Sequence, residues 1–221
     1  MFTISSGHGK YVSGASGYID EVTEARRVTD RVSEILKEMG IKVNTYHENT
    51  TKNKTDNLNT IIKHHNSTSR EKDVSIHFNA YQTTGKAMGV EVLYLSDSNK
   101  DLASKVSKAI AEAGGFLNRG AKCRTNLGFL NKTNKGAILI EVCFVDSKKD
   151  TELYKANFEK ICVSIAESLS GKKYEKINTT TNKTTYYRVI AGSYNDRTNA
   201  ENMKKRLTEL GIPSFLEAVT K

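Results

Sequence analysis

Over the first 170 residues, short apolar runs alternate with stretches in which apolar residues recur every three or four positions. The runs are typical of buried strands, and the helical spacing is typical of amphipathic helices. Gly40 and the pair Gly114–Gly115 follow two of these helices as stop signals. We predict strands over residues 2–10, 41–48, 73–80, 89–96, 126–133 and 137–145, and helices over residues 21–39, 54–66, 102–115 and 151–171.

This alternation decides the expected fold class. Strands that alternate with helices through short connections favour right-handed crossovers, which pair the strands in parallel. We therefore expect residues 1–170 to form an α/β domain with a mostly parallel sheet covered by helices.

The pattern changes after Gly171. Residues 171–185 hold four Lys, five Thr and one Glu with few large apolar groups, which indicates a solvated linker. Beyond it we predict a strand over residues 186–194, a helix over 199–211 and a strand over 212–218. A unit of about 36 residues is marginal alone. It should pair with a second copy of the chain, as a homodimer, or dock on the main domain.

Composition narrows the partners. The 221 residues carry a net charge of +9, spread along the chain, which suits a polyanion such as nucleic acid, an anionic membrane or a teichoic-acid-bearing cell wall. Trp is absent and no aromatic pair interleaves with an Arg cluster, which argues against nucleic acid. No apolar run approaches the roughly 18 residues of a membrane span. The N-terminus lacks the pattern of a cleaved signal peptide.

The three cysteines, Cys123, Cys143 and Cys162, are scattered and show no CxxC spacing. An odd number without that spacing argues against a disulfide framework and favours folding in a reducing compartment. We therefore expect a protein made in the cytoplasm.

Two histidines stand at the ends of predicted strands. In FTISSGHGK, His8 lies between Gly7 and Gly9, and His77 lies in the carboxyl-terminal part of residues 73–80. Sites in open α/β sheets form beyond the carboxyl ends of the strands, so both imidazoles could face one crevice. Histidine is the commonest metal ligand. For His8 alone, the competing interpretation is a hydrogen-bonded histidine in a turn.

The remaining histidines are weaker candidates. His47 closes a predicted strand in polar, loop-like surroundings. His64 and His65 lie at the end of a predicted helix near other charges, and we expect them to be solvated.

Helical geometry identifies a carboxylate that could join the two histidines as a third ligand. With about 100° per residue and Glu21 as the origin, the apolar stripe of residues 25–39 falls within about 60° of Glu21. Asp20 falls off this stripe, and Glu24 lies on its flank. A carboxylate at the head of an apolar stripe needs a cation or a hydrogen-bonding partner. The alternative is an ordinary first-turn Glu that complements the helix dipole; the two nearby histidines favour metal ligation.

Glu141 interrupts AILIEVCFV, the most apolar predicted strand. Burial raises the pKa of a carboxyl group, which suits general acid and base catalysis. The alternative is a structural carboxylate paired with Arg119 or Arg124. Two His, one Glu and a further buried Glu are the components of a hydrolytic zinc site.

SSGHGK, Glu21 at the start of a helix, SIHFNA, NRG (118–120) and ILIEVCFVDSKKD, in this order, resemble the motifs of the zinc-dependent N-acetylmuramoyl-L-alanine amidases of type 3. The resemblance covers roughly residues 1–170. It implies a twisted six-stranded sheet with helices on both faces, and cleavage of the amide between muramic acid and L-alanine in peptidoglycan. It also implies Zn²⁺ as cofactor, the ligands His8, Glu21 and His77, Glu141 as catalytic acid and base, and Asn79 and Arg119 as substrate-binding residues.

Two features depart from that family. YVSGASGYID replaces its usual Asp-Pro-Gly run after the first histidine, and Asp-Ser-Lys replaces its usual Ser-Asn after the Glu141 strand. Residues 186–221 are similar to half of a SPOR domain, a peptidoglycan-binding module. The resemblance therefore predicts an endolysin or a sporulation autolysin. Because no signal-peptide pattern is found, we expect it to reach the wall after holin action or cell lysis. A non-catalytic peptidoglycan-binding protein and a nucleic-acid-binding protein are the alternatives.

Overall fold

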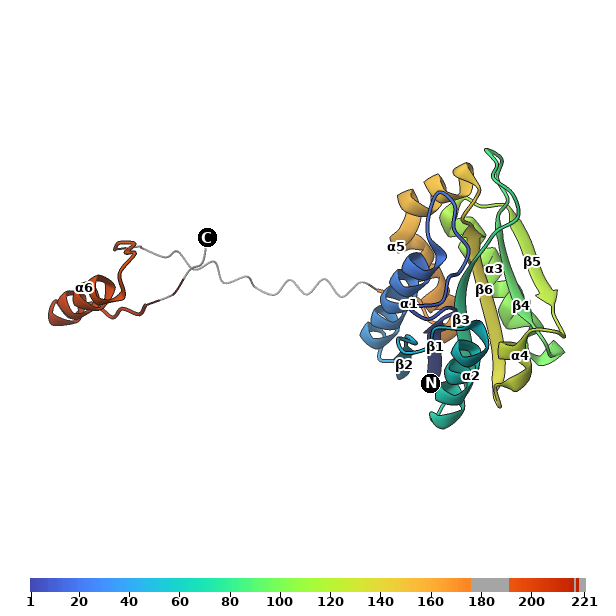
Figure 1. Cartoon of the computed structure of the whole chain (residues 1–221), viewed down its shortest axis with the longest axis horizontal. Helices are drawn as coiled ribbons and strands as arrows, with labels where there is room; N and C mark the ends of the chain where they lie inside the picture. The colour runs from blue at the N-terminus through green and yellow to red at the C-terminus, as the bar shows by residue number, and fades with distance from the viewer. Residues whose placement is uncertain (176–190, 217, 219–221) are drawn as a thin grey trace. The chain divides into compact units, whose positions relative to one another are not determined.

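The computed structural model describes residues 1–175, 191–216 and 218 of the chain (Figure 1). The chain divides into two compact units, Met1–Ile177 and Asn178–Lys221. Each unit is described by itself.

The first unit is built on one six-stranded sheet with the order β2-β1-β3-β6-β4-β5. Only β4 runs antiparallel to its neighbour β6, and the other pairs are parallel. This confirms the predicted mostly parallel α/β sheet. The strands are β1 (Phe2–Ser6), β2 (Val43–Tyr46), β3 (Lys72–Asn79), β4 (Val90–Tyr94), β5 (Asn118–Cys123) and β6 (Gly136–Phe144).

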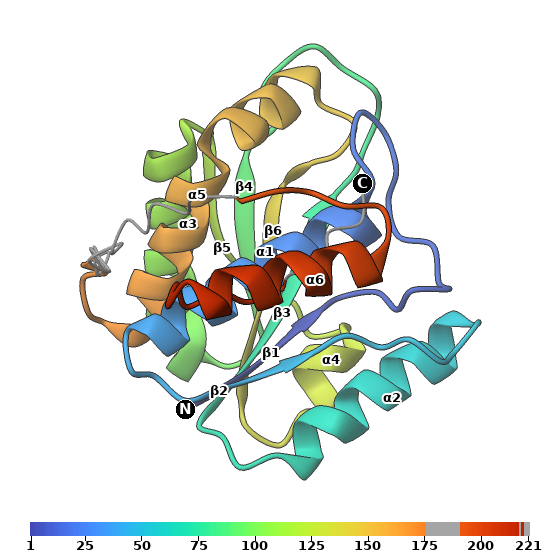
Figure 2. The same ribbon diagram turned by 90° about the vertical axis from the view of Figure 1, so that its left-hand side faces the viewer.

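Helices cover both faces of this sheet (Figure 2). One face carries α1 (Glu21–Glu38), α3 (Lys100–Gly114) and α5 (Lys148–Ser170); the other carries α2 (Lys54–Ser67) and α4 (Gly128–Lys132). A short 3-10 turn, η1 (Asp97–Asn99), precedes α3. Among the described residues no helix combines the length and the apolar character needed to cross a bilayer.

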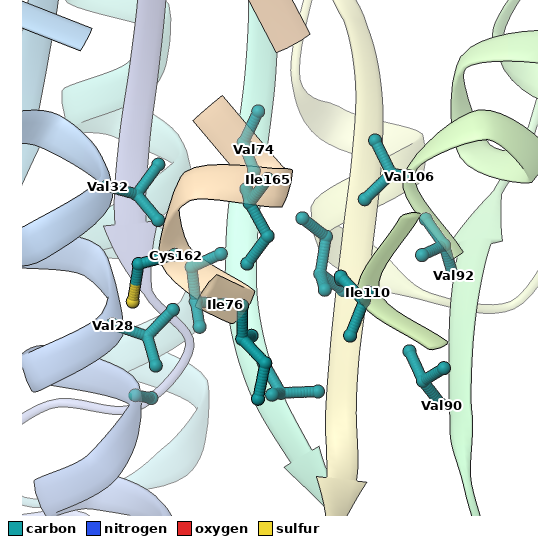
Figure 3. Packing of buried hydrophobic residues seen from close by; sticks show 14 of the residues in the cluster. Val28, Val32, Val74, Ile76, Val90, Val92, Val106, Ile110, Cys162 and Ile165 are labelled. Carbon is teal, nitrogen blue, oxygen red and sulfur yellow. The ribbon is translucent and has the colours of Figure 1, made fainter. Parts of the chain in front are cut away.

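The larger core lies between the sheet and the face formed by α1, α3 and α5 (Figure 3). Val28 and Val32 of α1 pack there together with Ile165 of α5, and all three are fully buried. Burying such a side chain stabilises the fold by about 1.5–3 kcal/mol. The apolar stripe that predicted α1 therefore serves to anchor that helix, and its first residue, against the sheet.

The fifth strand is not where we predicted it. Residues 126–133 contain the helix α4, whose Phe129 and Leu130 pack against the sheet. A short apolar run fits a buried helix turn as well as a strand. The strand is instead β5, which lies at the sheet edge, is largely accessible and has no apolar run to reveal it.

In the second unit the structure describes one helix, α6 (Arg197–Glu209), which confirms the predicted helix with its bounds shifted. The side chain of Asp196 caps it by accepting from the backbone N–H groups of Thr198 and Asn199. The predicted strand over 212–218 is wrong for its described residues, which are not in a strand, and residues 191–194 are not in a strand either. A strand needs a hydrogen-bonded neighbour. The rest of strand 186–194, and linker residues 176–185, lie outside the described residues.

Candidate metal centre and the adjoining carboxylates

Three predicted ligands converge at the carboxyl-terminal edge of the parallel strands. His8 follows β1, Glu21 is the first residue of α1, and His77 lies on β3. One potential ligand atom from each residue lies within 4.8 Å of the others. The structure thus brings together residues that are far apart in the sequence, from His8 to His77.

Glycine at position 7 makes this convergence possible. The Gly7 N–H donates to the carbonyl of Ile76 (2.8 Å), which ties the end of β1 to β3. A Cβ atom on Gly7 would stand only 2.0 Å from the His77 ring. Any side chain at this position would therefore displace the imidazole of His77.

Glu21 is held in place from several directions. It is only 3% exposed, and its Oε1 accepts from His77 Nδ1 (3.0 Å) and from the Phe78 N–H (3.1 Å). Its Oε2 accepts from the Ala15 N–H (2.6 Å) and lies 3.4 Å from His8 Nε2. Burial alone would raise the pKa of Glu21, but the hydrogen bonds from His77 and His8 outweigh it and hold that pKa well below its usual range.

This donor set fits zinc. A catalytic zinc usually has three ligands from His, Glu and Asp, and a fourth position open to water. One potential ligand atom from each of the three residues lies within 4.8 Å of the others, so the three side chains converge on a position where a single ion could contact them all. Zinc would also supply the cation that a buried carboxylate requires.

Glu141 lies beside this triad. It is paired with His77 in the register of β6 and β3. Part of its side chain is accessible, but Oε2 is buried and has no hydrogen-bond partner among the described residues. Burial first, and then the negative charges of Glu21 and Glu91, raise the pKa of Glu141 to about 8. The alternative pairing with Arg119 is not found, since the Arg119 guanidinium binds Glu91.

Glu91, which the sequence interpretation did not single out, connects the two predicted substrate-binding residues. Its Oε1 accepts from Asn79 Nδ2 (3.2 Å) and its Oε2 from Arg119 Nε (2.7 Å). Glu91 is 5% exposed and lies opposite Glu141 in the antiparallel pairing of β4 with β6. The signal was available: a carboxylate inside the apolar run GVEVLYLS is as costly to bury as the one in AILIEVCFV.

The other histidines lie outside the triad. His47 contacts Ser6 Oγ and Asp30 Oδ1, each at 2.9 Å, and His64 stacks on Tyr46 with ring centroids 3.8 Å apart. The expectation that His65 is solvated is wrong, because its side chain is 0% exposed. It faces the sheet from α2.

His65 belongs to a buried polar network. Its Nδ1 lies 2.7 Å from Asp73 Oδ1, and its Nε2 lies 2.9 Å from Ser5 Oγ. Arg70 Nε donates to the same Asp73 oxygen (2.6 Å). Burial alone would raise the pKa of Asp73, but the hydrogen bonds from His65 and Arg70 outweigh it and lower that pKa.

A second buried network supports the segment after His8. Asn57 Oδ1 accepts from the Gly9 N–H (3.3 Å), and Asn57 Nδ2 donates to Glu48 Oε2 (3.0 Å). The carbonyl of Glu48 accepts from the Lys10 N–H (2.9 Å). Residues 48 and 57 therefore fix the backbone that immediately follows the first candidate ligand.

The chain matches two known protein families. Residues 3–171 match the family described as N-acetylmuramoyl-L-alanine amidase. The chain belongs to the N-acetylmuramoyl-L-alanine amidase family. Residues 164–217 match the SPOR domain, and this match begins within α5. Both findings confirm the resemblances inferred from the motifs.

Solved structures of amidases share the fold. The catalytic domain of the CD27L endolysin targeting Clostridia difficile is 27% identical, with a TM-score of 0.71, over 79% of this chain and 98% of its own. The catalytic domain of the amidase CwlV from Bacillus (Paenibacillus) polymyxa is 25% identical, with a TM-score of 0.67, over 77% of this chain and 96% of its own.

A curated protein of 38.4 kDa from Clostridium perfringens is 31% identical over 155 residues, which cover 69% of this chain and 45% of that protein. A second protein from that species is 29% identical over 177 residues, which cover 78% of this chain and 52% of that protein. The chain therefore spans about half the length of the curated relatives it matches.

Proposed function

We propose that this chain is a zinc-dependent hydrolase that cleaves the amide bond between the lactyl group of N-acetylmuramic acid and L-alanine in peptidoglycan. Its role would be that of an endolysin or an autolysin. The observation that carries the proposal is the position of Glu141, which is paired with His77 of the triad in the sheet and has a buried carboxylate oxygen with no hydrogen-bond partner among the described residues. Membership of the amidase family supports the reaction class.

In this reaction His8, Glu21 and His77 would hold the zinc ion. Zinc bound there would lower the pKa of a water molecule and polarise the scissile carbonyl. Glu141 accepts a proton from the attacking water and then donates it to the departing nitrogen of L-alanine. A carboxyl group whose pKa is raised to about 8 can both take up and return a proton near neutral pH.

The chain would divide into a catalytic domain (residues 1–170), a linker (171–185) and a peptidoglycan-binding unit (186–221). The SPOR match supports the wall-binding role of the last part, and the division into two compact units is compatible with it. Asn79 and Arg119 would bind substrate beside Glu141. Pairing of two chains through residues 186–221 stays a prediction.

A lytic role has support from the comparisons. CD27L is described as an endolysin, and its catalytic domain is covered almost completely by this chain. The net charge of +9 would favour contact with an anionic cell wall.

The test is digestion of purified sacculi, with the new N-termini identified. Free N-terminal L-alanine should appear, the signal should vanish after chelation, and zinc should restore it. Muramidase or endopeptidase action would release other ends. A protein that sediments with sacculi but releases no L-alanine, with one zinc per chain, would instead be a non-catalytic wall binder. A variant that ends at residue 177 should keep activity on a soluble muropeptide and sediment less with sacculi.

A further inference from the structure

The chemical groups of the site follow one another across the edge of the sheet. The two histidines of the triad lie at the ends of β1 and β3, with Glu21 of α1 between them, and Glu141 lies on β6, Glu91 on β4 and Arg119 on β5. Glu141 therefore separates the candidate metal centre from a second polar cluster, which consists of Asn79, Glu91 and Arg119. None of these three residues takes up or donates a proton in the reaction proposed above, although the charge of Glu91 acts on Glu141.

Two irregularities in the sheet place this cluster. Between β4 and β5 the register passes from Val90 opposite Asn118 to Glu91 opposite Gly120, so Arg119 is left without a partner residue. Gly120 has a φ of +77°, which a side chain would strain. Bulges of this kind re-aim side chains and are common beside active sites.

The second irregularity lies between β3 and β6. There the register passes from His77 opposite Glu141 to Asn79 opposite Phe144, so β6 carries one extra residue. The extra residue lies on β6 between Glu141 and Phe144, directly after the candidate acid and base. One bulge therefore re-aims Arg119, and the other lies where the pairing of Glu141 with His77 gives way to that of Phe144 with Asn79.

The guanidinium group of Arg119 is held in place, but part of its hydrogen-bonding capacity is unused among the described residues. Its Nε donates to Glu91 Oε2 (2.7 Å), and its Cζ lies 5.0 Å from the centre of the Phe144 ring. Nη1 makes one long contact with the Met88 carbonyl (3.4 Å), and Nη2 has no hydrogen bond among the described residues. The side chain is 32% exposed. An Arg held in this way offers its outer N–H groups to a planar anion.

The orientation of the substrate in the proposed reaction determines which of its anionic groups reaches Arg119. Because Glu141 returns its proton to the leaving nitrogen, the peptide side of the scissile amide lies toward Glu141 and away from the triad. The stem peptide then extends toward β4 and β5. Its first free carboxylate belongs to the residue after L-alanine, which in peptidoglycan is D-glutamate or its uncharged α-amide, D-isoglutamine.

We propose that Arg119 binds the α-carboxylate of this second stem-peptide residue, and that Glu91 is a positioning residue that holds Arg119 and Asn79 for that contact. The inference rests on the proposed amidase function. It makes the chain selective for stem peptides whose D-glutamate is not amidated. Charge-assisted hydrogen bonds of this type correspond to about a 10- to 100-fold difference in binding.

The test uses two soluble substrates, MurNAc-L-Ala-D-Glu and MurNAc-L-Ala-D-isoGln, with the zinc-loaded full chain. The wild type should show a KM at least about tenfold lower for the first and similar kcat values for both. Arg119→Gln should raise KM for the first substrate to the value for the second and leave kcat unchanged. Arg119→Lys should recover part of the difference.

Glu91→Gln should reduce the same KM ratio, because Arg119 keeps its charge but loses its anchor. Any change in kcat should be equal for the two substrates, since Glu91 lies opposite Glu141 and its charge acts on that carboxyl group. Arg124→Gln, at an exposed position just after β5, is the matched control and should behave like the wild type. Equal KM values for both substrates in the wild type would overturn the inference while leaving the amidase function intact. So would equal losses on both substrates in Arg119→Gln, which would indicate a structural role. Cleavage of neither substrate would overturn the proposed function and this inference with it.

Discussion

Glu141 lies directly opposite His77 in the parallel register of β6 and β3. Side chains alternate between the faces of a sheet, so a slip of one residue would turn Glu141 away from the triad. The core residues Ile76 and Ile140, both fully buried, are paired one position earlier and fix that register. Ordinary hydrophobic packing therefore places the proposed catalytic carboxyl group beside the candidate metal centre.

The first prediction concerns this carboxyl group. Glu141→Gln should lower the rate of L-alanine release by at least about 10²-fold, because the amide cannot carry the proton. Zinc content should not change, since Glu141 is outside the triad. Metal analysis and the sacculus assay measure both. Glu152→Gln, at an exposed position on α5, is the control and should keep full activity; full activity in Glu141→Gln would reject its role as acid and base.

The second prediction separates the histidines. His8→Ala should lose both zinc and activity, because only two of the three ligands remain. His47→Ala should keep zinc, since the His47 ring binds Ser6 and Asp30 and not the triad. Both variants can be compared by zinc titration after chelation. Equal zinc loss in the two would mean that position 8 acts through the fold and not as a ligand.

The third prediction concerns the space beside His77. Gly7→Ala should weaken zinc binding by about 10- to 100-fold, because the new methyl group would displace the imidazole by contact at 2.0 Å. Gly85→Ala is the matched control, because a Cβ there meets nothing within 4 Å. Competition with a chromogenic chelator gives the affinities. Wild-type affinity in Gly7→Ala would show that His77 can rearrange without cost to the site.

The sequence predicted those parts of the molecule whose signal is local. The apolar stripe of α1 correctly placed Glu21 on the buried face, and the run AILIEVCFV correctly marked Glu141 as a costly carboxylate inside a strand. In both cases the physical penalty for burying a charge is visible in a few consecutive residues.

What escaped prediction depends on contacts between distant segments. The edge strand β5 has no apolar run, because one of its sides has no neighbouring strand and much of it is accessible. His65 was misjudged because its partners, Ser5 and Asp73, come from other elements. The bulge that leaves Arg119 unpaired cannot be read from NRG without knowing what β4 places opposite it.

The fourth prediction follows from the buried position of His65. His65→Ala should lower the free energy of unfolding by about 1.5–3 kcal/mol, because Ser5 and Asp73 lose a buried hydrogen-bond partner while Arg70 still pairs with Asp73. His64→Ala should cost about 1 kcal/mol or less, since His64 mainly stacks on Tyr46. Urea denaturation measures both. Equal, small losses would contradict a structural role for the His65–Asp73 pair.

The last prediction concerns acid stability and Glu48. Burial alone would raise the pKa of Glu48, but hydrogen bonds from Thr50 and Thr51 outweigh it and lower that pKa from 4.5 to about 2. A carboxyl group with a depressed pKa in the folded state stabilises the fold above its unfolded pKa. This stabilisation is lost as the pH falls from 4.5 toward 2.

Glu48→Gln should therefore be less stable than the wild type by roughly 1–3 kcal/mol at neutral pH, and the gap should close as the pH falls through that window. Denaturant unfolding at pH 7, 4 and 2.5 would follow the difference between the two proteins. Glu152→Gln is again the control, because Glu152 is exposed and makes no hydrogen bond among the described residues. Its difference from the wild type in free energy of unfolding should stay small at all three pH values. A gap for Glu48→Gln that is independent of pH would mean that the side chain contributes through packing and not through its charge.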